Sequence, residues 1–222
     1  MKKTNSILFI CLIITMTIMG CKATKTQKGA VIGTAGGAAT GAVIGRASGN
    51  TALGAIIGAA VGGVTGTLIG RKMDKQAKEL EREIPGAVVE RVGEGIVVEF
   101  SGKILFGFDN SELTPEAKIN LKKAIEVLNN YPDTEIVVQG HTDSKGSEAY
   151  NQPLSEKRAK TANYFLSQNG ISSSRLSTKG FGETAPKYTN ETEEGRTLNR
   201  RIEFLIIANE KMKKEAAREA KK

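Results

Sequence analysis

The residues best suited to chemistry in this chain are one acid and two arginines in separate segments. Asp143 lies in the stretch HTDSKGSEAYNQPLSEKRA (residues 141–159), on a predicted loop that follows Gly140. Arg158 lies near the end of the same stretch, on a predicted helix, and Arg200 follows later in the triplet NRR. A carboxylate accepts hydrogen bonds from an ammonium group, and a planar guanidinium binds a carboxylate through parallel hydrogen bonds. The pattern therefore predicts either a site for a charged ligand or ion pairs that hold loop to helix.

The remaining side chains predict neither an enzyme nor a metal site. His141 is the single histidine of the 222 residues. A zinc site needs several ligands of the His, Cys or acidic type, and a Ser–His–Asp triad needs its three members in contact. The Gly-x-Gly pattern at residues 180–182 lacks the spacing of a phosphate-binding loop. We expect no catalytic residue, no metal and no cofactor, and we interpret His141 as a loop residue near the binding site.

Helical and strand patterns alternate along the segment that carries these charges. Thr114 followed by Pro115 is typical of a helix start, and a second helix is expected to end before Gly170. Strands are expected where residues alternate or form short apolar runs, at residues 95–106, 135–139, 175–181 and 201–207. This order predicts one compact α+β domain over residues 91–208, with the helices on one side of a mixed sheet.

Pro153 leaves two possibilities open for the start of the second helix. A helix that begins at Ser147 contains the proline and loses one hydrogen bond. A helix capped by Asn151 places the proline in its first turn, where the lost hydrogen bond costs nothing. In that case the Asn151 side chain is used by the backbone, which argues against a role in ligand binding.

Three separated segments of the chain resemble the C-terminal domain family of OmpA, which binds peptidoglycan non-covalently. They are FGFDNSELTPEAK (residues 106–118), the stretch at residues 141–159, and GRTLNRRIEF (residues 195–204). The resemblance implies the βαβαβ fold of that family, a two-layer sandwich with a mixed sheet. It also implies the ligand, because the diaminopimelate of the peptidoglycan stem peptide ends in an ammonium and a carboxylate.

The residues that match the family motifs are expected to contact this ligand. By resemblance, Asp143 binds the ammonium and Arg158 binds the carboxylate. The resemblance implies further contacts from Asp109, Asn151, Leu154 with Ser155, and Arg200. In the alternative interpretation, Asp143 and Arg158 pair with each other and Asp109 caps a loop. Asn199 and Arg201 fit a structural role equally well.

The distribution of charge argues against a nucleic-acid partner. The formal net charge is +8, but residues 1–70 hold six Lys or Arg and no acid, and residues 210–222 hold six against three acids. Residues 91–209 carry fifteen basic and sixteen acidic residues, so the predicted domain is close to neutral. Positive charge at the two ends is typical of a membrane-facing or solvated segment rather than of a groove for phosphates.

The first residues predict export and lipid anchoring. Lys2 and Lys3 precede an apolar run of signal-peptide length within residues 1–20. The run ends in IMGC, which resembles a bacterial lipobox, although Met19 departs from the small residue usual at that position. Cys21 is then lipidated and begins the mature chain, followed by a linker over residues 21–28. The alternative is an ordinary secretory signal that leaves Cys21 as a free thiol, since no second mature cysteine exists to form a disulfide.

Glycine recurs at every fourth position over residues 29–70, with one interruption at residues 46–50. This period places the glycines on one face of a helix. Each interior glycine costs about 1 kcal/mol relative to alanine, a penalty that close helix–helix approach offsets. We interpret the segment as a helical hairpin packed glycine face to glycine face. A flexible linker is the alternative, and the residues do not decide whether the hairpin enters the bilayer or mediates homo-oligomerisation.

The two charged segments that flank the domain complete the predicted organisation. Residues 71–90 are expected to form a charged helical stalk or linker, and residues 209–222 a charged tail. The resemblance and the lipobox together predict a lipoprotein of the outer membrane that faces the periplasm and tethers that membrane to the cell wall. The alternatives are a protein that perturbs or perforates membranes through its glycine-rich hairpin, and an accessory factor in envelope assembly.

The glycine hairpin predicts opposite effects for leucine on and off the glycine row. Gly37→Leu and Gly62→Leu should separate the two packed backbones, although leucine improves helix propensity by nearly 1 kcal/mol. We expect both to abolish cross-linking between cysteines introduced on the two arms, measured in membranes and in detergent. Thr34→Leu and Thr67→Leu, off the row, should preserve it. Unchanged cross-linking in the glycine variants would identify the segment as a linker.

Overall fold

The computed structural model describes residues 64–106 and 110–222. The predicted signal peptide, Cys21, the predicted linker after it and residues 29–63 of the glycine-rich segment lie outside the described residues, as does Asp109. The predictions made for those positions therefore stay predictions.

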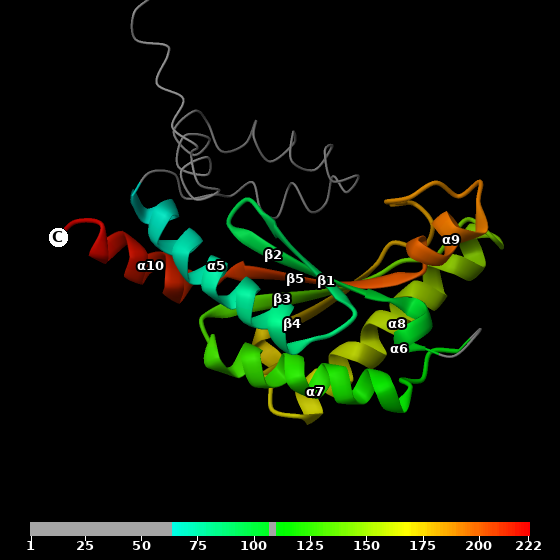
Figure 1. The fold of residues 1–222 in the computed structure, drawn as a ribbon, viewed down its shortest axis with the longest axis horizontal. Helices are drawn as coiled ribbons and strands as arrows, with labels where there is room; N and C mark the ends of the chain where they lie inside the picture. Colours follow the sequence, from blue (N-terminus) through cyan, green and yellow to red (C-terminus); the bar gives the residue numbers. More distant parts are fainter. Residues whose placement is uncertain (1–63, 107–109) are drawn as a thin grey trace, which may run out of the picture.

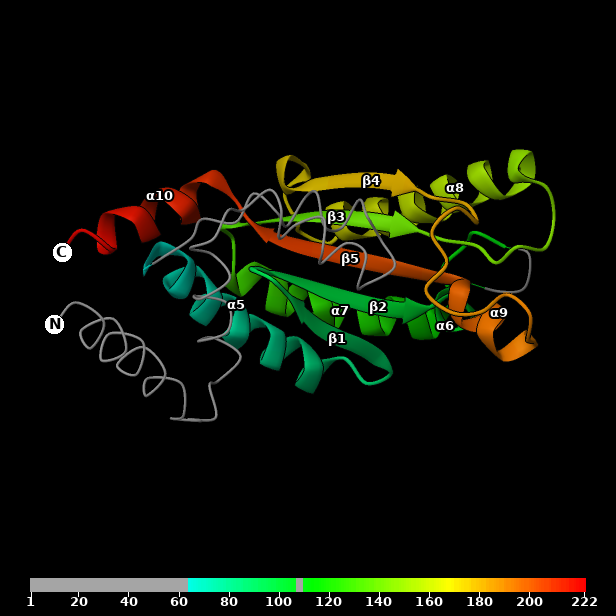
Figure 2. The same ribbon diagram turned by 90° about the horizontal axis from the view of Figure 1, so that it is seen from above.

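A mixed sheet of five strands forms the centre of the domain (Figure 2). The strand order is β1-β2-β5-β3-β4, and every neighbouring pair is antiparallel except β3 and β4. This sheet confirms the predicted α+β fold class. The strands span Ala87–Val92 (β1), Gly95–Ser101 (β2), Thr134–Gly140 (β3), Leu176–Gly180 (β4) and Arg201–Ala208 (β5).

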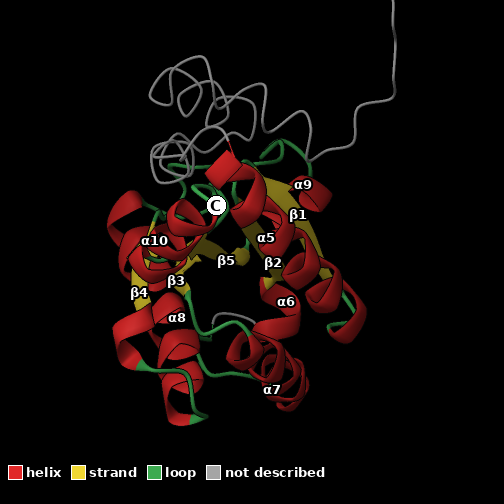
Figure 3. Ribbon diagram, turned by 90° about the vertical axis from the view of Figure 1, so that its left-hand side faces the viewer, coloured by secondary structure: helices red, strands yellow, loops and turns green. Residues whose placement is uncertain are grey.

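Helices cover one face of this sheet, and in Figure 3 α7 and α8 lie below it. The start of α7 is as predicted, because the Thr114 side chain accepts a hydrogen bond from the Ala117 backbone and Pro115 is the first helical residue. The described helices are α5 (Val64–Glu83), α6 (Gly102–Leu105), α7 (Pro115–Asn130), α8 (Glu148–Gln168), α9 (Glu193–Asn199) and α10 (Glu210–Glu219), with a short 3-10 helix at Ser173–Arg175.

Helix α8 settles the question that Pro153 left open. The helix begins at Glu148, directly after Ser147, and continues through Pro153. The alternative in which Asn151 caps the helix is therefore wrong. Proline cannot donate the hydrogen bond that residue 153 would make to residue 149, but near the helix start this removes a single bond. The Asn151 side chain is consequently not used as a cap.

The segments expected to flank the domain instead pack into its core. Ile69, Met73 and Leu80 of α5 are buried in the same hydrophobic cluster as the inner face of the sheet. Met212 and Ala216 of α10 belong to that cluster as well. The apolar residues of the expected stalk share one helical face, and this face is covered by the sheet and by α7 rather than by solvent. Residues 87–90 of the predicted stalk are also part of strand β1, so the compact unit includes α5, all of β1 and α10 in addition to residues 91–208.

Two glycines allow α8 to lie directly against the ends of β3 and β4. Gly140 and Gly180 are partners in the parallel ladder. A Cβ atom on Gly140 would lie 2.1 Å from the Ser155 carbonyl oxygen, and one on Gly180 would lie 2.6 Å from the Ser155 hydroxyl. Since no real Cβ approaches so closely, only glycine permits this contact.

Alanine at Gly140 should therefore destabilise the domain. Gly140→Ala forces α8 away from the strand end, and overpacking of this kind costs about 1–3 kcal/mol, which a urea-unfolding curve measures. Gly70→Ala on α5 is the matched control, because a Cβ atom there meets no atom of residues 64–106 and 110–222 within 4 Å. The control should gain up to about 1 kcal/mol from helix propensity. Equal effects of the two substitutions would show that the Gly140 contact is not a tight one.

Candidate functional site

The candidate residues meet at one end of the sheet because loops that connect its strands lie close together there. β2, β3 and β4 end at this end of the sheet and β5 begins there, as the pairs Ser101 with Arg201 and Gly140 with Ile202 show. The loop after β3 carries Asp143, and the residue before β5 is Arg200. In Figure 1 this end lies on the right, beside α9, and α10 lies at the other end. We call it the site end.

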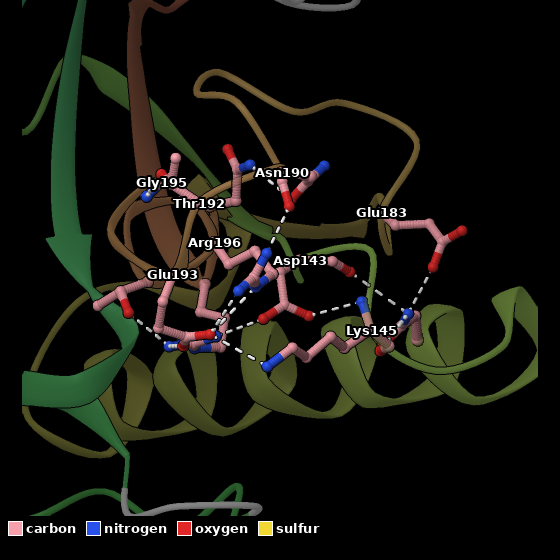
Figure 4. Close-up of polar contacts among 12 residues, drawn as sticks. Asp143, Lys145, Glu183, Asn190, Thr192, Glu193, Gly195 and Arg196 are labelled. Atoms are coloured by element: carbon pink, nitrogen blue, oxygen red, sulfur yellow. Dashed lines mark hydrogen bonds and ion pairs between the residues drawn. The ribbon is translucent and has the colours of Figure 1, made fainter.

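Asp143 is held by a loop that folds back onto it. Its side chain is 7% exposed. One carboxylate oxygen, Oδ1, accepts a hydrogen bond from the Lys145 backbone at 3.0 Å, and the other, Oδ2, accepts one from Nη1 of Arg200. Gly146, with φ of 103°, allows the chain to turn after Lys145 toward α8. Figure 4 shows Asp143 between Lys145 and the residues of α9.

Asn151 fixes the same loop from the side of α8. Its amide nitrogen donates to the Lys145 carbonyl at 3.1 Å and to the Glu183 carboxylate, and it lies 3.4 Å from the Asp143 carbonyl oxygen. The asparagine is buried. A buried amide that bonds loop carbonyls and a carboxylate holds both loops in place. Asn151 therefore positions Asp143 in this structure.

Arg158 lies on the same face of α8 as Asn151, two helical turns later. Its Nε donates to the Asn110 carbonyl at 3.0 Å, and its guanidinium carbon lies 5.4 Å from the centre of the Phe106 ring. The side chain is buried, so these contacts fix the guanidinium plane. Leu154, between Asn151 and Arg158 on this face, is half-buried.

A network of exposed ion pairs surrounds Arg200. Its Nη2 donates to Glu193 at 3.1 Å and to the Thr197 hydroxyl at 2.6 Å. Glu193 also accepts from Lys145 Nζ at 3.0 Å and from two nitrogens of Arg196. The Lys145, Arg196 and Arg200 hydrogen bonds lower the pKa of Glu193 from 4.5 to about 2. Burial acts to lower the pKa of Arg200, but its bonds to Asp143 and Glu193 outweigh this and raise it.

The structure thus brings together Asp143, Asn151 and Arg200 and places Arg158 and Leu154 on the helix beside them. Asp143 does form an ion pair, as the alternative interpretation required, but the partner is Arg200 rather than the expected Arg158. Asp109 lies outside the described residues. Sequence reasoning missed Glu193, whose spacing to Arg196, Thr197 and Arg200 is i+3, i+4 and i+7, the spacing of one helical face. That periodicity could have identified it.

Beneath these residues lies a second, buried polar layer. Arg201 Nε donates to Glu203 at 2.7 Å, and both side chains are buried. Asn199 bonds the backbone of Lys187 and Tyr188, so both it and Arg201 have structural roles. His141 stacks on Phe181 with 5.0 Å between ring centres. Burial, and then the nearby Arg201 charge, lower the pKa of His141 well below its ordinary value, so the imidazole is neutral. Within residues 64–106 and 110–222, no cluster of His, Cys or acidic side chains could hold a metal.

Comparison with known families gives two matches. Residues 105–200 match the OmpA family, and residues 1–74 match the YMGG-like Gly-zipper. The outer membrane porin F of Pseudomonas fluorescens is 39% identical over 112 residues, which cover 50% of this chain and 34% of the porin. The peptidoglycan-binding protein ArfA of Mycobacterium tuberculosis is 37% identical over 105 residues, or 47% of this chain and 32% of ArfA. The probable lipoprotein YiaD of Escherichia coli is 34% identical over 121 residues, covering 54% and 55% of the two chains.

Two solved structures share the fold. A putative MotB-like protein from Desulfovibrio vulgaris has a TM-score of 0.59 at 22% identity, covering 64% of this chain and 94% of that protein. The cell wall anchor of the T6SS from Pseudomonas aeruginosa has a TM-score of 0.55 at 27% identity, covering 60% and 97%. The chain spans about a third of the length of the porin and of ArfA, so the similarity concerns one domain of those proteins.

The Glu193 network makes a prediction about pH. Because its pKa is lowered below 4.5, ionised Glu193 stabilises the folded network fully above about pH 4.5, and this contribution is lost as the pH falls through about 2. A carboxyl titration followed by NMR should place the Glu193 midpoint near 2. Lys145→Ala removes the largest cause and should raise the midpoint toward 4.5, whereas Lys118→Ala on α7 should leave it unchanged. A midpoint near 4.5 in the parent would contradict the network.

Proposed function

We propose, on the basis that residues 105–200 form a domain of the OmpA family, that this protein binds peptidoglycan non-covalently and tethers the outer membrane to the cell wall. The observation that carries the proposal is the ion pair of Asp143 with Arg200 at the site end, and the buried Arg158 guanidinium on α8 supports it. The protein acts by binding alone, without making or breaking a bond. The printed name of ArfA, a relative with the same domain, supports peptidoglycan as the ligand.

The ligand group that fits Asp143 is an ammonium. A buried carboxylate without a partner costs about 3–5 kcal/mol relative to its paired state, and in the free protein Arg200 supplies the positive charge. The ammonium of diaminopimelate would therefore replace Arg200 at Asp143. Such an exchange returns less free energy than a newly formed contact, so we expect modest affinity for a single stem peptide.

The displaced Arg200 would remain near the ligand. Its second nitrogen is held by Glu193 and Thr197 independently of Asp143. The nitrogen released from Asp143 could then donate to the carboxylate beside the ammonium, together with Arg158. Asp143 would then face the ammonium, and the two guanidinium groups would face the carboxylate of the same ligand group.

The positions of the chain entry and of the site, at opposite ends of the domain, support a tether. The described chain enters α5 at Val64, and in Figure 1 the beginning of α5 lies near α10, away from the site end. A lipid on Cys21 would therefore hold the membrane on one side of the domain while the ligand binds on the other. The lipoprotein name of the relative YiaD and the Gly-zipper match of residues 1–74 support the anchored part of the proposal. Among the described residues, no helix has both the length and the apolar composition needed to cross a bilayer.

Substitutions of the two charged residues should weaken binding to purified sacculi. Asp143→Asn removes the complement to the ammonium, and Arg158→Lys keeps the charge but loses the planar fork. We expect each to cost about 1–3 kcal/mol of binding free energy, measured by co-sedimentation of the protein with sacculi.

Matched controls separate binding from folding. Asp133→Asn removes a surface carboxylate paired with Lys211, and Arg175→Lys alters a guanidinium that bonds carbonyls of residues 128, 131 and 134. Arg175→Lys should lower stability and leave sedimentation intact, and Asp133→Asn should change neither. A soluble muropeptide with free diaminopimelate should compete, and one with an acetylated terminal amine should not. Normal sedimentation of the Asp143 and Arg158 variants would overturn the site assignment.

A further inference from the structure

Helices α5 and α10 form a second functional candidate at the end of the domain opposite to the site end. They pack against each other through buried residues of one cluster, Ile69 and Met73 from α5 and Met212 and Ala216 from α10. Lys72 Nζ lies 3.9 Å from a Glu215 carboxylate oxygen across this contact. Packing therefore joins two charged segments that are more than a hundred residues apart in the sequence.

Basic side chains line the outer surfaces of both helices. Arg71, Lys75 and Lys78 follow the spacing i, i+4 and i+7 on α5, and all three are exposed. Lys214, Arg218 and Lys221 repeat the same spacing along α10 and the residues after it, and are exposed too. Helical spacing places each set on one face. We call these six residues, together with the exposed Lys222, the basic end.

The acids nearby do not neutralise the basic end. Asp74 pairs with Arg91 at 2.8 Å, and Glu215 lies 3.9 Å from both Lys72 and Lys211. Over residues 64–106 and 110–222, no ion pair involves any of the seven residues of the basic end. Glu79 of α5 bonds Tyr131, and exposed Glu81 and Glu219 are too few to balance the seven cations. The surface therefore carries a clear excess of positive charge.

The helix dipole explains only part of this pattern. Cations near the last turn of a helix are favourable, which accounts for Arg218 and the lysines after it. Arg71 and Lys75 lie before the last turn of α5, where the dipole gives cations no benefit. A ligand of opposite charge outside the molecule accounts for both sets.

We propose that the basic end docks on an anionic lipid surface. The chain reaches α5 from residue 63, so this end of the domain is the one joined to the segment with the predicted lipid anchor. Val64, at the start of α5, is exposed and apolar. Lys and Arg next to an anionic bilayer each contribute about 1 kcal/mol of binding free energy. Neither α5 nor α10 contains an aromatic side chain of the kind that stacks on nucleic-acid bases.

Docking at this end would orient the domain. With the basic end on the lipid headgroups, Asp143 and Arg200 face away from the membrane. This inference does not rest on peptidoglycan binding, because the two surfaces lie at opposite ends of the domain. Either of them can be lost without the other.

The test compares vesicle types with the full chain. We expect the parent to partition more strongly into phosphatidylcholine vesicles that contain phosphatidylglycerol than into phosphatidylcholine vesicles alone, and salt should reduce the difference. The triple variant Arg218→Glu, Lys221→Glu, Lys222→Glu should lower the ratio of the two partition coefficients by roughly a hundredfold or more, from about 1 kcal/mol per charge. The pair Arg71→Glu, Lys75→Glu on α5 should lower it in the same direction.

A matched control makes the same charge change elsewhere. Lys118→Glu, Lys122→Glu, Lys123→Glu on α7 alters the net charge equally and should keep at least most of the parental ratio. All variants should keep a urea-unfolding midpoint close to the parental one, which reports an intact fold independently of lipid and of peptidoglycan. An unchanged ratio in the α10 variant, or an equal fall in the α7 control, would overturn the docking surface. Binding of duplex DNA as tight as that of the anionic vesicles at the same salt concentration would overturn the assignment of lipid.

Discussion

The close contact between α8 and the ends of β3 and β4 is the constraint on which the site depends. Gly140 and Gly180 lie side by side in the sheet, and neither has room for a Cβ atom beneath Ser155. The Ser155 hydroxyl donates to the Gln152 carbonyl and accepts from the Gly182 backbone at 2.9 Å. This bond ties the helix to the loop after β4. The distance between helix and sheet, and with it the positions of Asn151 and Arg158 relative to Asp143, follows from these backbone contacts.

Two neighbouring arginines at the start of β5, Arg200 and Arg201, form ion pairs of different kinds. Arg200, which is partly exposed, pairs with buried Asp143 and exposed Glu193, and Arg201 lies in a buried pair with Glu203. An ion pair sealed from water has a fixed geometry, whereas a half-exposed one can exchange partners at low cost. Arg201 therefore suits a structural role and Arg200 suits a ligand site. Neutral His141, stacked on Phe181, fills the space beneath the loop without adding charge.

Because α5 and α10 pack into the core, a pulling force on the proposed tether would act on the whole domain rather than on a free helix. In the proposed tether, a helix that continued as a free stalk would bend between membrane and wall. Instead Met73 and Leu80 are buried in the same core as Phe100 and Phe204 of the sheet. Tyr131 of the adjoining segment is linked to Glu79 of α5, and burial, together with that hydrogen bond, raises its pKa to about 12. Force applied between Val64 and the site end would therefore pass through the core, whose cooperative packing resists local opening.

By itself the sequence determined the α+β class, helices α7 and α8 and the strands β2 to β5, whereas β1, α6 and α9 were not predicted. Thr114 with Pro115, the apolar spacing of the helices and the strand runs are local signals, and local signals are read correctly when tertiary packing agrees with them. The motifs around Asp143, Arg158 and Arg200 are local signals too, and the role of these residues in ligand binding stays a prediction. The predictions for Cys21 and for residues 29–63 rest on sequence alone.

Tertiary structure decided which groups meet. Charges in separate segments give no sequence signal of their pairing. The partner of Asp143 is Arg200 and not Arg158, and this follows from the register of β3 and β5. The membership of α5 and α10 in the core was likewise hidden, because an amphipathic helix has the same pattern whether a partner helix or a sheet covers its apolar face. The start of α8 was ambiguous because proline costs one hydrogen bond, and contacts with the sheet outweigh that loss.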